Sequence, residues 1–421
     1  MSEDGSSFRA PKGTRDILPP ESWRLEALYD LAADTFAAAA YAPIETPMFE
    51  HTEVFARGVG ETSEVVNKQM YTFPDKGGRS LTLRPENTAP VVRAVLEHNL
   101  HRGALPVKLY YAGPQFRQER PQKGRYREFF QIGIEAIGAP GPTIDAEVIE
   151  LGHRFLRDAG VEPHLKLNSI GHPADDCRLG YNRALVDYLQ ARVDDLAPGD
   201  RGRIETNPLR TFDSKEGRTR EVMSTAPLIT EHLCPDCKAH FERVQDLLRS
   251  VGVPFDVDPR IVRGLDYYTR TAFEFTAGGL GSQDAVGGGG RYDGLAESLG
   301  GEQIAGIGFA LGVDRILLAT GDNGPSRGSR VEVYVVAAGE DAARPAFALA
   351  CRLRAGGIGA EIDHMARGMK AQMKDADRSG ARWAAIVGPD ELAAGEITLK
   401  NLREGVQERI PIDEVEGRVR S

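Results

Sequence analysis

Gly113-Pro-Gln-Phe-Arg-Gln-Glu-Arg-Pro-Gln-Lys-Gly-Arg-Tyr-Arg-Glu-Phe-Phe-Gln-Ile-Gly-Ile-Glu135 decides the fold, because it joins an arginine-rich loop to a strand with two different faces. Side chains alternate across a strand with a period of two residues. One face is predicted to pack on a core and carries Phe130, Ile132, Ile134 and Ala136. The other face carries an amide, a gap and a carboxylate, from Gln131, Gly133 and Glu135. A solvated strand face is the common alternative, but the adjacent arginines favour a small polar ligand held over a sheet.

Size and composition indicate a globular protein of two or three domains. The chain has 421 residues, of which 41% are hydrophobic and 27% are charged, and these are ordinary values for a globular protein. No apolar run approaches the roughly 20 residues of a membrane helix, and the first residues lack the pattern of a secretory signal. Four cysteines do not make a disulfide framework. We therefore expect a cytoplasmic protein without a membrane segment.

Basic residues cluster in two places, although the net charge of −10 excludes a uniformly basic surface. The first cluster is one short loop that contains Arg117, Arg120, Lys123, Arg125 and Arg127. Like charges so close together repel one another unless an anion is present, so this loop predicts a phosphate-bearing partner. The second cluster has the three- and four-residue spacing of a helix face and consists of Arg367, Lys370, Lys374, Arg378 and Arg382. It fits a solvated helix face and a nucleic-acid contact equally well.

The pattern of helices and strands predicts three domains and one linker. Residues 1–170 and 259–322 mix both element types and are expected to form one discontinuous domain. Between them, residues 171–258 carry long helical patterns and are predicted to be an inserted helical domain. Residues 323–330 have the composition of a linker. Residues 331–421 alternate strands and helices, which is typical of an α/β domain.

Two glycine-rich motifs fall in the first domain. Gly306 to Arg315 has the spacing Gly-x-Gly-x-x-x-Gly, which differs from the dinucleotide-binding fingerprint. We expect its glycines to let a helix pack closely on a sheet and to leave Arg315 free to reach a ligand. The run Gly287–Gly290 allows a close backbone approach to a ligand or a flexible turn, and the sequence does not separate these alternatives.

Cys234-Pro-Asp-Cys237 has the spacing of half a zinc site. A second half is not evident in the sequence, because Cys177 and Cys351 stand alone and His240 would add only one nitrogen. Structural zinc sites use four protein ligands. We therefore expect this pair to form a turn at the start of a helix, and no metal ligand is predicted from it.

Taken together, these motifs resemble those of the histidyl-tRNA synthetases, which belong to class II of the aminoacyl-tRNA synthetases. The resemblance covers essentially the whole chain. Thr46-Pro47 is similar to motif 1 of the class, residues 116–135 to motif 2, and residues 308–315 to motif 3. The family's amino-acid loop and its two histidine motifs are similar to Leu83-Arg-Pro-Glu-Asn-Thr88, Arg263-Gly-Leu-Asp-Tyr-Tyr-Thr269 and Gly288-Gly-Gly-Arg-Tyr-Asp-Gly294.

The resemblance implies an α+β protein in three parts: a catalytic domain with a six-stranded antiparallel sheet, an inserted helical domain and a C-terminal α/β anticodon-binding domain. It implies that histidine and ATP form histidyl-adenylate and pyrophosphate, and that the histidyl group then passes to the 3′ adenosine of tRNA(His). It further implies a homodimer with motif 1 at the interface, and Mg²⁺ as the companion of ATP.

The resemblance also assigns roles to individual residues. Three arginines bind ATP, of which the first two are also the catalytic residues: Arg117 and Arg263 at the α-phosphate, and Arg315 at the γ-phosphate. The histidine ammonium group is assigned to Glu86, Thr88 and Gln131. The imidazole is assigned to Glu135 and Tyr268, with Tyr292 closing the pocket. The tRNA acceptor end is assigned to the loop residues Arg120, Gln122, Lys123, Arg125 and Arg127, with Gln122 as the reader of an extra 5′ guanosine.

The main alternative is a catalytically silent relative, the regulatory subunit of ATP phosphoribosyltransferase. That class of protein senses histidine. It typically lacks the anticodon-binding domain and has lost ATP-binding arginines. Here Arg117, Arg263 and Arg315 are all present, and residues 331–421 are enough for a further domain. We therefore expect the ligase and not the regulatory subunit.

Overall fold

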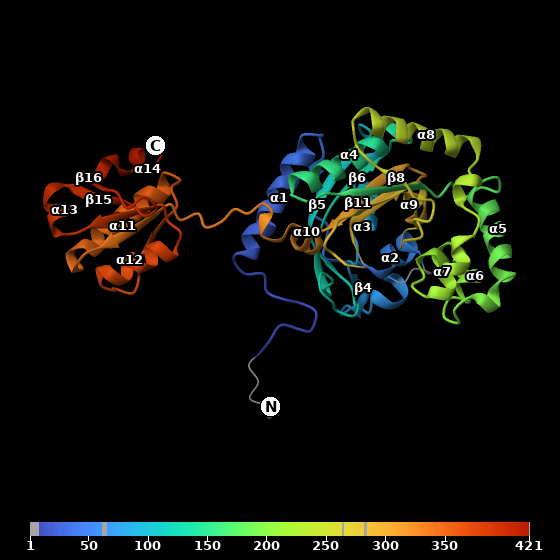
Figure 1. Cartoon of the computed structure of the whole chain (residues 1–421), viewed down its shortest axis with the longest axis horizontal. Coiled ribbons are helices and arrows are strands. Elements are labelled where there is room, and N and C mark those ends of the chain that lie inside the picture. The colour runs from blue at the N-terminus through green and yellow to red at the C-terminus, as the bar shows by residue number, and fades with distance from the viewer. Residues whose placement is uncertain (1–7, 61–64, 263–264, 282–283, 421) are drawn as a thin grey trace, which may run out of the picture. The chain divides into compact units, whose positions relative to one another are not determined.

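The chain forms two compact units, Met1–Ser326 and Arg327–Ser421, in a computed structural model (Figure 1). The structure describes residues 8–60, 65–262, 265–281 and 284–420. The predicted linker, residues 323–330, spans the boundary between the units, and the predicted anticodon-binding domain lies in the second. None of the helices in these ranges combines the length and apolar character needed to cross a lipid bilayer.

An eight-stranded sheet forms the centre of the first unit. Its strands, in spatial order, are β1 (Ala42–Pro43), β5 (Val107–Phe116), β6 (Glu128–Ile137), β11 (Gly306–Gly312), β10 (Ala285–Arg291), β9 (Thr269–Thr276), β7 (His164–Ser169) and β8 (Asp256–Val257). The six inner strands are antiparallel, and the two-residue strands β1 and β8 add parallel edges. The predicted α+β fold with an antiparallel catalytic sheet is confirmed.

Strand β6 has the two faces that its sequence predicts. Ile132, Ile134 and Ala136 belong to the main hydrophobic core, and Phe130 packs against it. Four helices contribute to this core: α1 (Glu21–Ala37), α4 (Pro142–Asp158), α8 (Pro235–Ser250) and α10 (Val313–Thr320). Ile137 has the opposite parity and packs in a smaller core on the other face of the sheet. Gln131 and Glu135 share that parity, so the polar row of β6 lies on the side of the smaller core.

The smaller core is built mainly by helix α3 (Thr88–Glu97) and helix α9 (Leu295–Ser298). Beside it, helix α2 (Thr52–Val59) contacts α3 and α9. A separate three-stranded sheet has the order β2 (Phe49–His51), β4 (Ser80–Leu83), β3 (Tyr71–Pro74). This sheet ends next to the loop that leads into α3, so it positions the segment that contains Glu86.

The predicted helical insertion, residues 171–258, consists of two parts with different cores. Helices α5 (Arg178–Gln190), α6 (Arg203–Thr206) and α7 (Gly217–Ser224) surround a small core of their own. Helix α8 packs instead on α4, and Phe241, Val244 and Leu248 of α8 belong to the main core. The part with an independent core therefore lies between the end of β7 and the start of α8 (Figure 1).

The second unit is an α/β domain around a five-stranded sheet. Its strands, in spatial order, are β13 (Ala360–Ile362), β12 (Val333–Ala337), β14 (Trp383–Val387), β15 (Glu396–Asn401) and β16 (Gln407–Pro411). Two cores lie on opposite faces of it. Its helices are α11 (Ala343–Ala355), α12 (Met369–Arg378), α13 (Pro389–Ala394) and α14 (Val415–Arg420).

The second basic cluster lies only partly on α12: Arg367 precedes the helix and Arg382 lies beyond its end, so the predicted single helix face is wrong in part. Part of its charge is also neutralised. Arg367 forms ion pairs with Asp363 and Asp375, and Arg378 also pairs with Asp375. Lys370 and Lys374 are exposed on the same helix. These two lysines are therefore the part of the cluster that best fits a phosphate contact.

Candidate active site

A cavity of about 420 Å³ lies on the polar side of the sheet in the first unit. Eight of the predicted site residues line it: Glu86, Thr88, Arg117, Arg125, Gln131, Tyr268, Tyr292 and Arg315. They come from strands, helix starts and loops that are far apart in the chain, so the fold brings together residues that the motifs place separately. Arg263 lies outside the residues that the structure describes.

Glu135 lies beneath the cavity, fully buried within a cluster of hydroxyl groups. Its Oε1 accepts a hydrogen bond of 2.7 Å from Thr88 Oγ1, and its Oε2 accepts one of 2.5 Å from the Tyr292 hydroxyl. The Tyr111 hydroxyl lies 3.5 Å from Oε1. Burial raises the pKa of Glu135 to about 8, because the hydroxyl donors only partly offset the loss of water. The carboxyl group is thus held by neutral donors, and no cationic side chain among the described residues forms an ion pair with it.

The gap predicted at Gly133 is partly filled, which differs from the expectation of an open row along β6. Gly133 pairs with Tyr111 on β5, and a Cβ atom at Gly133 would lie 2.5 Å from Cζ of that tyrosine. The sequence of β6 alone could not show this, because the ring comes from the neighbouring strand. Tyr111 is therefore a site residue that the sequence interpretation missed.

The glycines of residues 306–312 also have a different role from the one predicted. They lie in strand β11, in the middle of the sheet, and do not serve mainly to seat a helix on it. Gly308 pairs with Glu135, and a side chain at Gly308 would collide with Oε2 of that carboxylate. A side chain at Gly306 would collide with the ring of Tyr292. The missing side chains leave room for the buried acid and its tyrosine partner.

Glu86 and Thr88 are positioned by the start of helix α3. The two carboxylate oxygens of Glu86 accept hydrogen bonds from the backbone N–H groups of Thr88 at 2.7 Å and Ala89 at 3.0 Å. These N–H groups have no partner inside the helix. Burial raises the pKa of Glu86, partly offset by the same two N–H groups. Glu86 therefore caps a helix and presents its carboxyl group at the cavity wall.

Gln131 is the clearest sign of a ligand in this cavity. Its side-chain oxygen is buried and has no hydrogen-bond partner among the described residues. A buried acceptor without a partner costs about 1–3 kcal/mol, and such groups commonly mark a binding site. Because Gln131 lines the cavity, a donor group of a ligand can satisfy it.

Arg117 and Arg315 are two of the four arginines that line the cavity in the described part of the chain, beside Arg125 and Arg210. Arg117, directly after β5, donates from Nε to the carbonyl oxygen of Pro85 at 2.9 Å, and its guanidinium lies 5.1 Å from the centre of the Phe129 ring. Arg315, in the first turn of α10, donates from Nε to the carbonyl oxygen of Ala285. Burial lowers the pKa of both groups, but arginine stays charged at neutral pH. In both side chains, the hydrogen bond from Nε to a backbone oxygen positions the guanidinium group.

The loop between β5 and β6 is a small hairpin at the rim of the cavity. Gln122 and Arg125 exchange backbone hydrogen bonds of 3.1 and 2.9 Å around Gly124, whose φ of +74° suits glycine. Arg120, Gln122, Lys123 and Arg125 are exposed. Arg127 is half-buried and donates to backbone carbonyl groups of Glu119 and Lys12. Four of the five predicted tRNA contacts thus project from the loop, and Arg127 braces its base.

Arg291, within one of the two histidine motifs, does not line the cavity. It is fully buried and forms an ion pair with Asp145, which is also fully buried. His240 Nε2 lies 2.8 Å from Asp145, and the Thr271 hydroxyl donates to Asp145 at 2.6 Å. This buried cluster joins α4, α8, β9 and β10. In the sequence, His240 is a possible further nitrogen ligand for a metal. In the structure, its Nε2 forms a hydrogen bond with Asp145 instead.

The insertion also reaches the site. Arg210 lines the cavity, and its Nη2 lies 3.4 Å from Asp266. The Asn207 amide donates to the same carboxylate at 3.0 Å, and Arg178 donates to the backbone oxygen of Tyr268 at 2.5 Å. No sequence pattern indicates these contacts, because they join two segments whose pairing depends on the fold of the insertion.

Comparison with known proteins agrees with this arrangement. The histidyl-tRNA synthetase family matches residues 13–316, and an anticodon-binding domain family matches residues 332–421. The histidine–tRNA ligase of Moorella thermoacetica is 50% identical over 406 residues, which cover 96% of this chain and 95% of that protein. The corresponding protein of Corynebacterium kroppenstedtii is 49% identical, with 98% and 97% covered.

A solved structure supports the same relationship. The apo histidyl-tRNA synthetase of S. aureus superposes with a TM-score of 0.83 at 37% identity, covering 99% of this chain and all of the other. The family match, the full-length relatives and the solved structure agree with one another. The chain belongs to the histidyl-tRNA synthetase family.

Proposed function

We propose that this protein attaches L-histidine to tRNA(His) in two steps. In the first, the histidine carboxylate attacks the α-phosphate of ATP, a P–O bond forms, and pyrophosphate leaves. In the second, the 3′-terminal adenosine of the tRNA takes the histidyl group and AMP leaves. The observation that carries this proposal is one cavity that is lined by four arginines, with the buried carboxyl group of Glu135 beneath it.

The hydroxyl cluster around Glu135 supports the proposed binding of the imidazole ring of histidine. A neutral imidazole offers one donor and one acceptor, and a protonated one offers two donors. Glu135 can accept from one ring nitrogen, and the Tyr268 hydroxyl is assigned to the other. A ring without nitrogens would leave these buried groups unpaired, which is the basis of strong discrimination. The ammonium group is assigned to Gln131, whose acceptor has no partner among the described residues, together with Glu86 and Thr88.

At the phosphate end, catalysis requires positioning and charge stabilisation, because the attacking carboxylate is already ionised. Arg117 and Arg263 would bind the α-phosphate, where negative charge builds up, and Arg315 would bind the γ-phosphate. Mg²⁺ would enter as the counter-ion of ATP. The carboxylate of Glu274 faces the same cavity and is a candidate to meet that ion.

The tRNA acceptor end is assigned to the exposed side chains of the β5–β6 hairpin. Arg120, Lys123 and Arg125 offer positive charge beside the cavity, which suits a phosphate backbone. Gln122 lies at the tip and is the assigned reader of an extra 5′ guanosine. The anticodon end is assigned to the second unit, where Lys370 and Lys374 are exposed.

We further propose a cytoplasmic homodimer with Thr46-Pro47 at its interface. Phe49 and Phe73 support this, because they contact each other on the three-stranded sheet and are 52% and 40% exposed. Large exposed apolar side chains that adjoin one another are common at protein interfaces. Sedimentation equilibrium measures the association directly, and Phe49→Asp should shift it toward the monomer.

Pyrophosphate exchange with ATP, screened over all twenty amino acids, tests the proposed reaction. We expect exchange with histidine alone. Exchange with no amino acid, together with histidine binding, would instead support the regulatory-subunit alternative.

Variants of Arg117 and Arg263 test the proposed contacts to the α-phosphate of ATP. Arg117→Ala and Arg263→Ala should each abolish exchange while the circular dichroism spectrum stays unchanged. The matched control is Arg57→Ala, because Arg57 is exposed on α2 and lies outside the cavity lining. Near-normal exchange in either arginine variant would remove that residue from the mechanism.

A further inference from the structure

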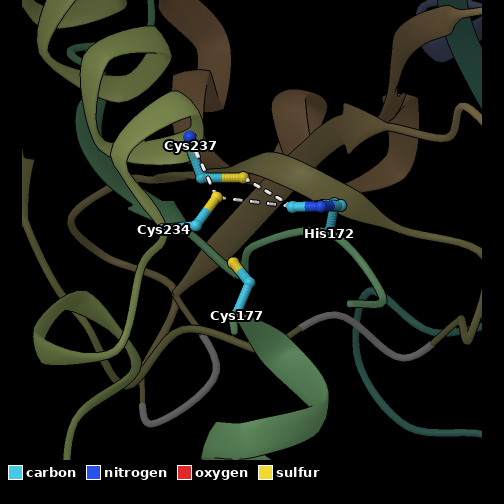
Figure 2. Close-up of side chains that lie close together, drawn as sticks. All are labelled: His172, Cys177, Cys234 and Cys237. Carbon is cyan, nitrogen blue, oxygen red and sulfur yellow. Dashed lines mark hydrogen bonds between the residues drawn. The ribbon is translucent and has the colours of Figure 1, made fainter. Parts of the chain in front are cut away.

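Four side chains of the kinds that bind metals converge between the end of strand β7 and the start of helix α8 (Figure 2). They are His172, Cys177, Cys234 and Cys237, and one ligand atom from each lies within 4.8 Å of all the others. His172 Nδ1 is 3.1 Å from Cys237 Sγ and 3.7 Å from Cys234 Sγ. The Cys234–Cys237 pair, for which the sequence showed no second half, thus has two further ligand groups beside it.

The spacing of these atoms suits a single small ion. With Zn–S bonds of about 2.3 Å and Zn–N bonds of about 2.0–2.1 Å, a tetrahedral ion holds its ligand atoms roughly 3.5–3.8 Å apart. The separations of 3.1 and 3.7 Å from His172 Nδ1, and the limit of 4.8 Å across the whole cluster, lie around these values. Three thiolates and one imidazole form one of the usual ligand sets of structural zinc, whereas iron–sulfur clusters generally use four thiolates or two thiolates with two imidazoles.

The backbone around the cluster is shaped for these ligands. Cys234 precedes helix α8, and its sulfur lies 3.5 Å from the backbone nitrogen of Cys237, which donates to it. Gly171 has φ of +64°, and a Cβ atom there would lie 2.6 Å from the Cys177 sulfur. The chain can therefore turn tightly between β7 and α5 only because this position has no side chain.

Burial indicates a closed structural site. Cys177, Cys234 and Cys237 are 1%, 6% and 1% exposed, and His172 is half-buried. A disulfide would use only two of the three sulfurs and leave a thiol and an imidazole beside it. Four protein ligands, by contrast, satisfy one ion completely and leave no open position for catalysis.

We propose that His172, Cys177, Cys234 and Cys237 bind one Zn²⁺ ion that ties together the two ends of the insertion. His172 and Cys177 follow strand β7, and Cys234 and Cys237 begin helix α8, which packs on α4. Arg178, next to Cys177, donates to the backbone oxygen of Tyr268. The ion would therefore fix the base of the insertion against the segment that carries Tyr268.

Metal analysis of the full chain tests the proposal. The protein is purified without a metal-affinity step from cells grown with zinc, and its metal content is measured by inductively coupled plasma mass spectrometry. We expect about one zinc per chain, in keeping with one four-ligand site. Cys234→Ser/Cys237→Ser should lose the zinc, whereas Cys351→Ser, in the second unit, should retain it.

Cobalt substitution keeps the test independent of whether a cysteine variant folds. Wild-type protein is stripped with a chelator under reducing conditions and titrated with Co²⁺ alone. We expect the visible and near-ultraviolet bands of tetrahedral thiolate coordination, saturating at one ion per chain. We also expect the stripped protein to unfold at a Tm lower by at least about 3 °C, and to be cut faster by protease within residues 178–233.

Two results would overturn the proposal. One is purified protein without zinc that, fully reduced, gives no such bands with Co²⁺. The other is a disulfide among Cys177, Cys234 and Cys237, found by peptide mapping of protein prepared under reducing conditions. Neither result would affect the proposed ligase reaction, which pyrophosphate exchange measures separately.

Discussion

Two fully buried carboxyl groups in the first unit, Glu135 and Asp145, meet opposite environments. Asp145 contacts the guanidinium of Arg291 and the ring of His240. Burial alone would raise its pKa, but His240 and Arg291 outweigh that effect and lower it. Among the described residues, Glu135 has only hydroxyl groups as hydrogen-bond partners, and burial raises its pKa to about 8. The comparison teaches that Asp145 is already neutralised by cationic groups within the protein, whereas Glu135 is not, which fits the proposed role of Glu135 in binding a polar ligand.

Removing the paired carboxylate should have the largest effect on stability. Asp145→Ala would leave Arg291 buried without its main counter-charge, and such a loss costs about 3–5 kcal/mol. Urea unfolding should show this loss, while the folded fraction keeps a nearly unchanged KM for histidine. The matched control is Asp246→Ala, which breaks an exposed ion pair with Arg249 on α8 and should cost less than about 1 kcal/mol. Equal losses in the two variants would contradict the structural role of Asp145.

Glu135→Gln should affect substrate binding and leave the fold intact. The amide keeps the size of the side chain but replaces one carboxyl oxygen with an NH2 group that cannot accept a hydrogen bond. The buried partner left without an acceptor costs about 1–3 kcal/mol, so KM for histidine should rise roughly 5- to 150-fold. KM for ATP should change much less. Pyrophosphate exchange measures both constants, and Glu128→Gln at the start of the same strand is the control. Equal rises in the two constants would refute the assignment of Glu135 to imidazole.

The raised pKa of Glu135 also predicts a pH-dependent stability. Between its ordinary value of 4.5 and about 8, folded Glu135 keeps a proton that the unfolded chain has lost. The unfolded state binds fewer protons in this window, so stability falls as pH rises through it. The unfolding free energy of the wild type, relative to Glu135→Gln, should decrease by at least about 1 kcal/mol between pH 5 and 8.5. A difference independent of pH would show that Glu135 is ionised throughout.

Tyr292→Phe should give the smallest of these effects. It removes the hydroxyl that donates to Glu135 Oε2, a neutral partner worth about 1 kcal/mol, so KM for histidine should rise roughly fivefold. Because that hydrogen bond lowers the pKa of Glu135, its loss should also move the pH-dependent step in stability to higher pH. A step that stays in place would argue against direct coupling between the two residues.

Local periodicity made part of the fold and site predictable. The two faces of β6 follow from alternation within ten residues, and the strand Trp383–Val387 lies where its apolar run predicts. The family resemblance supplied the separated motifs that meet at the cavity. Contacts between distant segments were not predictable in this way: the ring of Tyr111 filling the space at Gly133, and the pairing of His172 with Cys234. They depend on register and on chain crossings, which no single stretch of sequence encodes.

Helix α8 illustrates the same limit at the level of domains. Its sequence is amphipathic like that of the other helices near it, so composition groups it with the insertion. Its apolar side chains Phe241, Val244 and Leu248 lie in the main core because the chain has already returned to α4. A helix pattern reports that one face is buried, but not which neighbour buries it.

The short separation between His172 and Cys234 has a consequence for how such a chain can be re-engineered. Their side chains meet within 3.7 Å, so the polypeptide departs from the sheet and comes back at almost one spot. The residues between these two positions form a module with its own hydrophobic core. A few linking residues could replace it without straining the strands, but the shortened chain would also lose the contacts of Arg178, Asn207 and Arg210 to the segment that carries Tyr268.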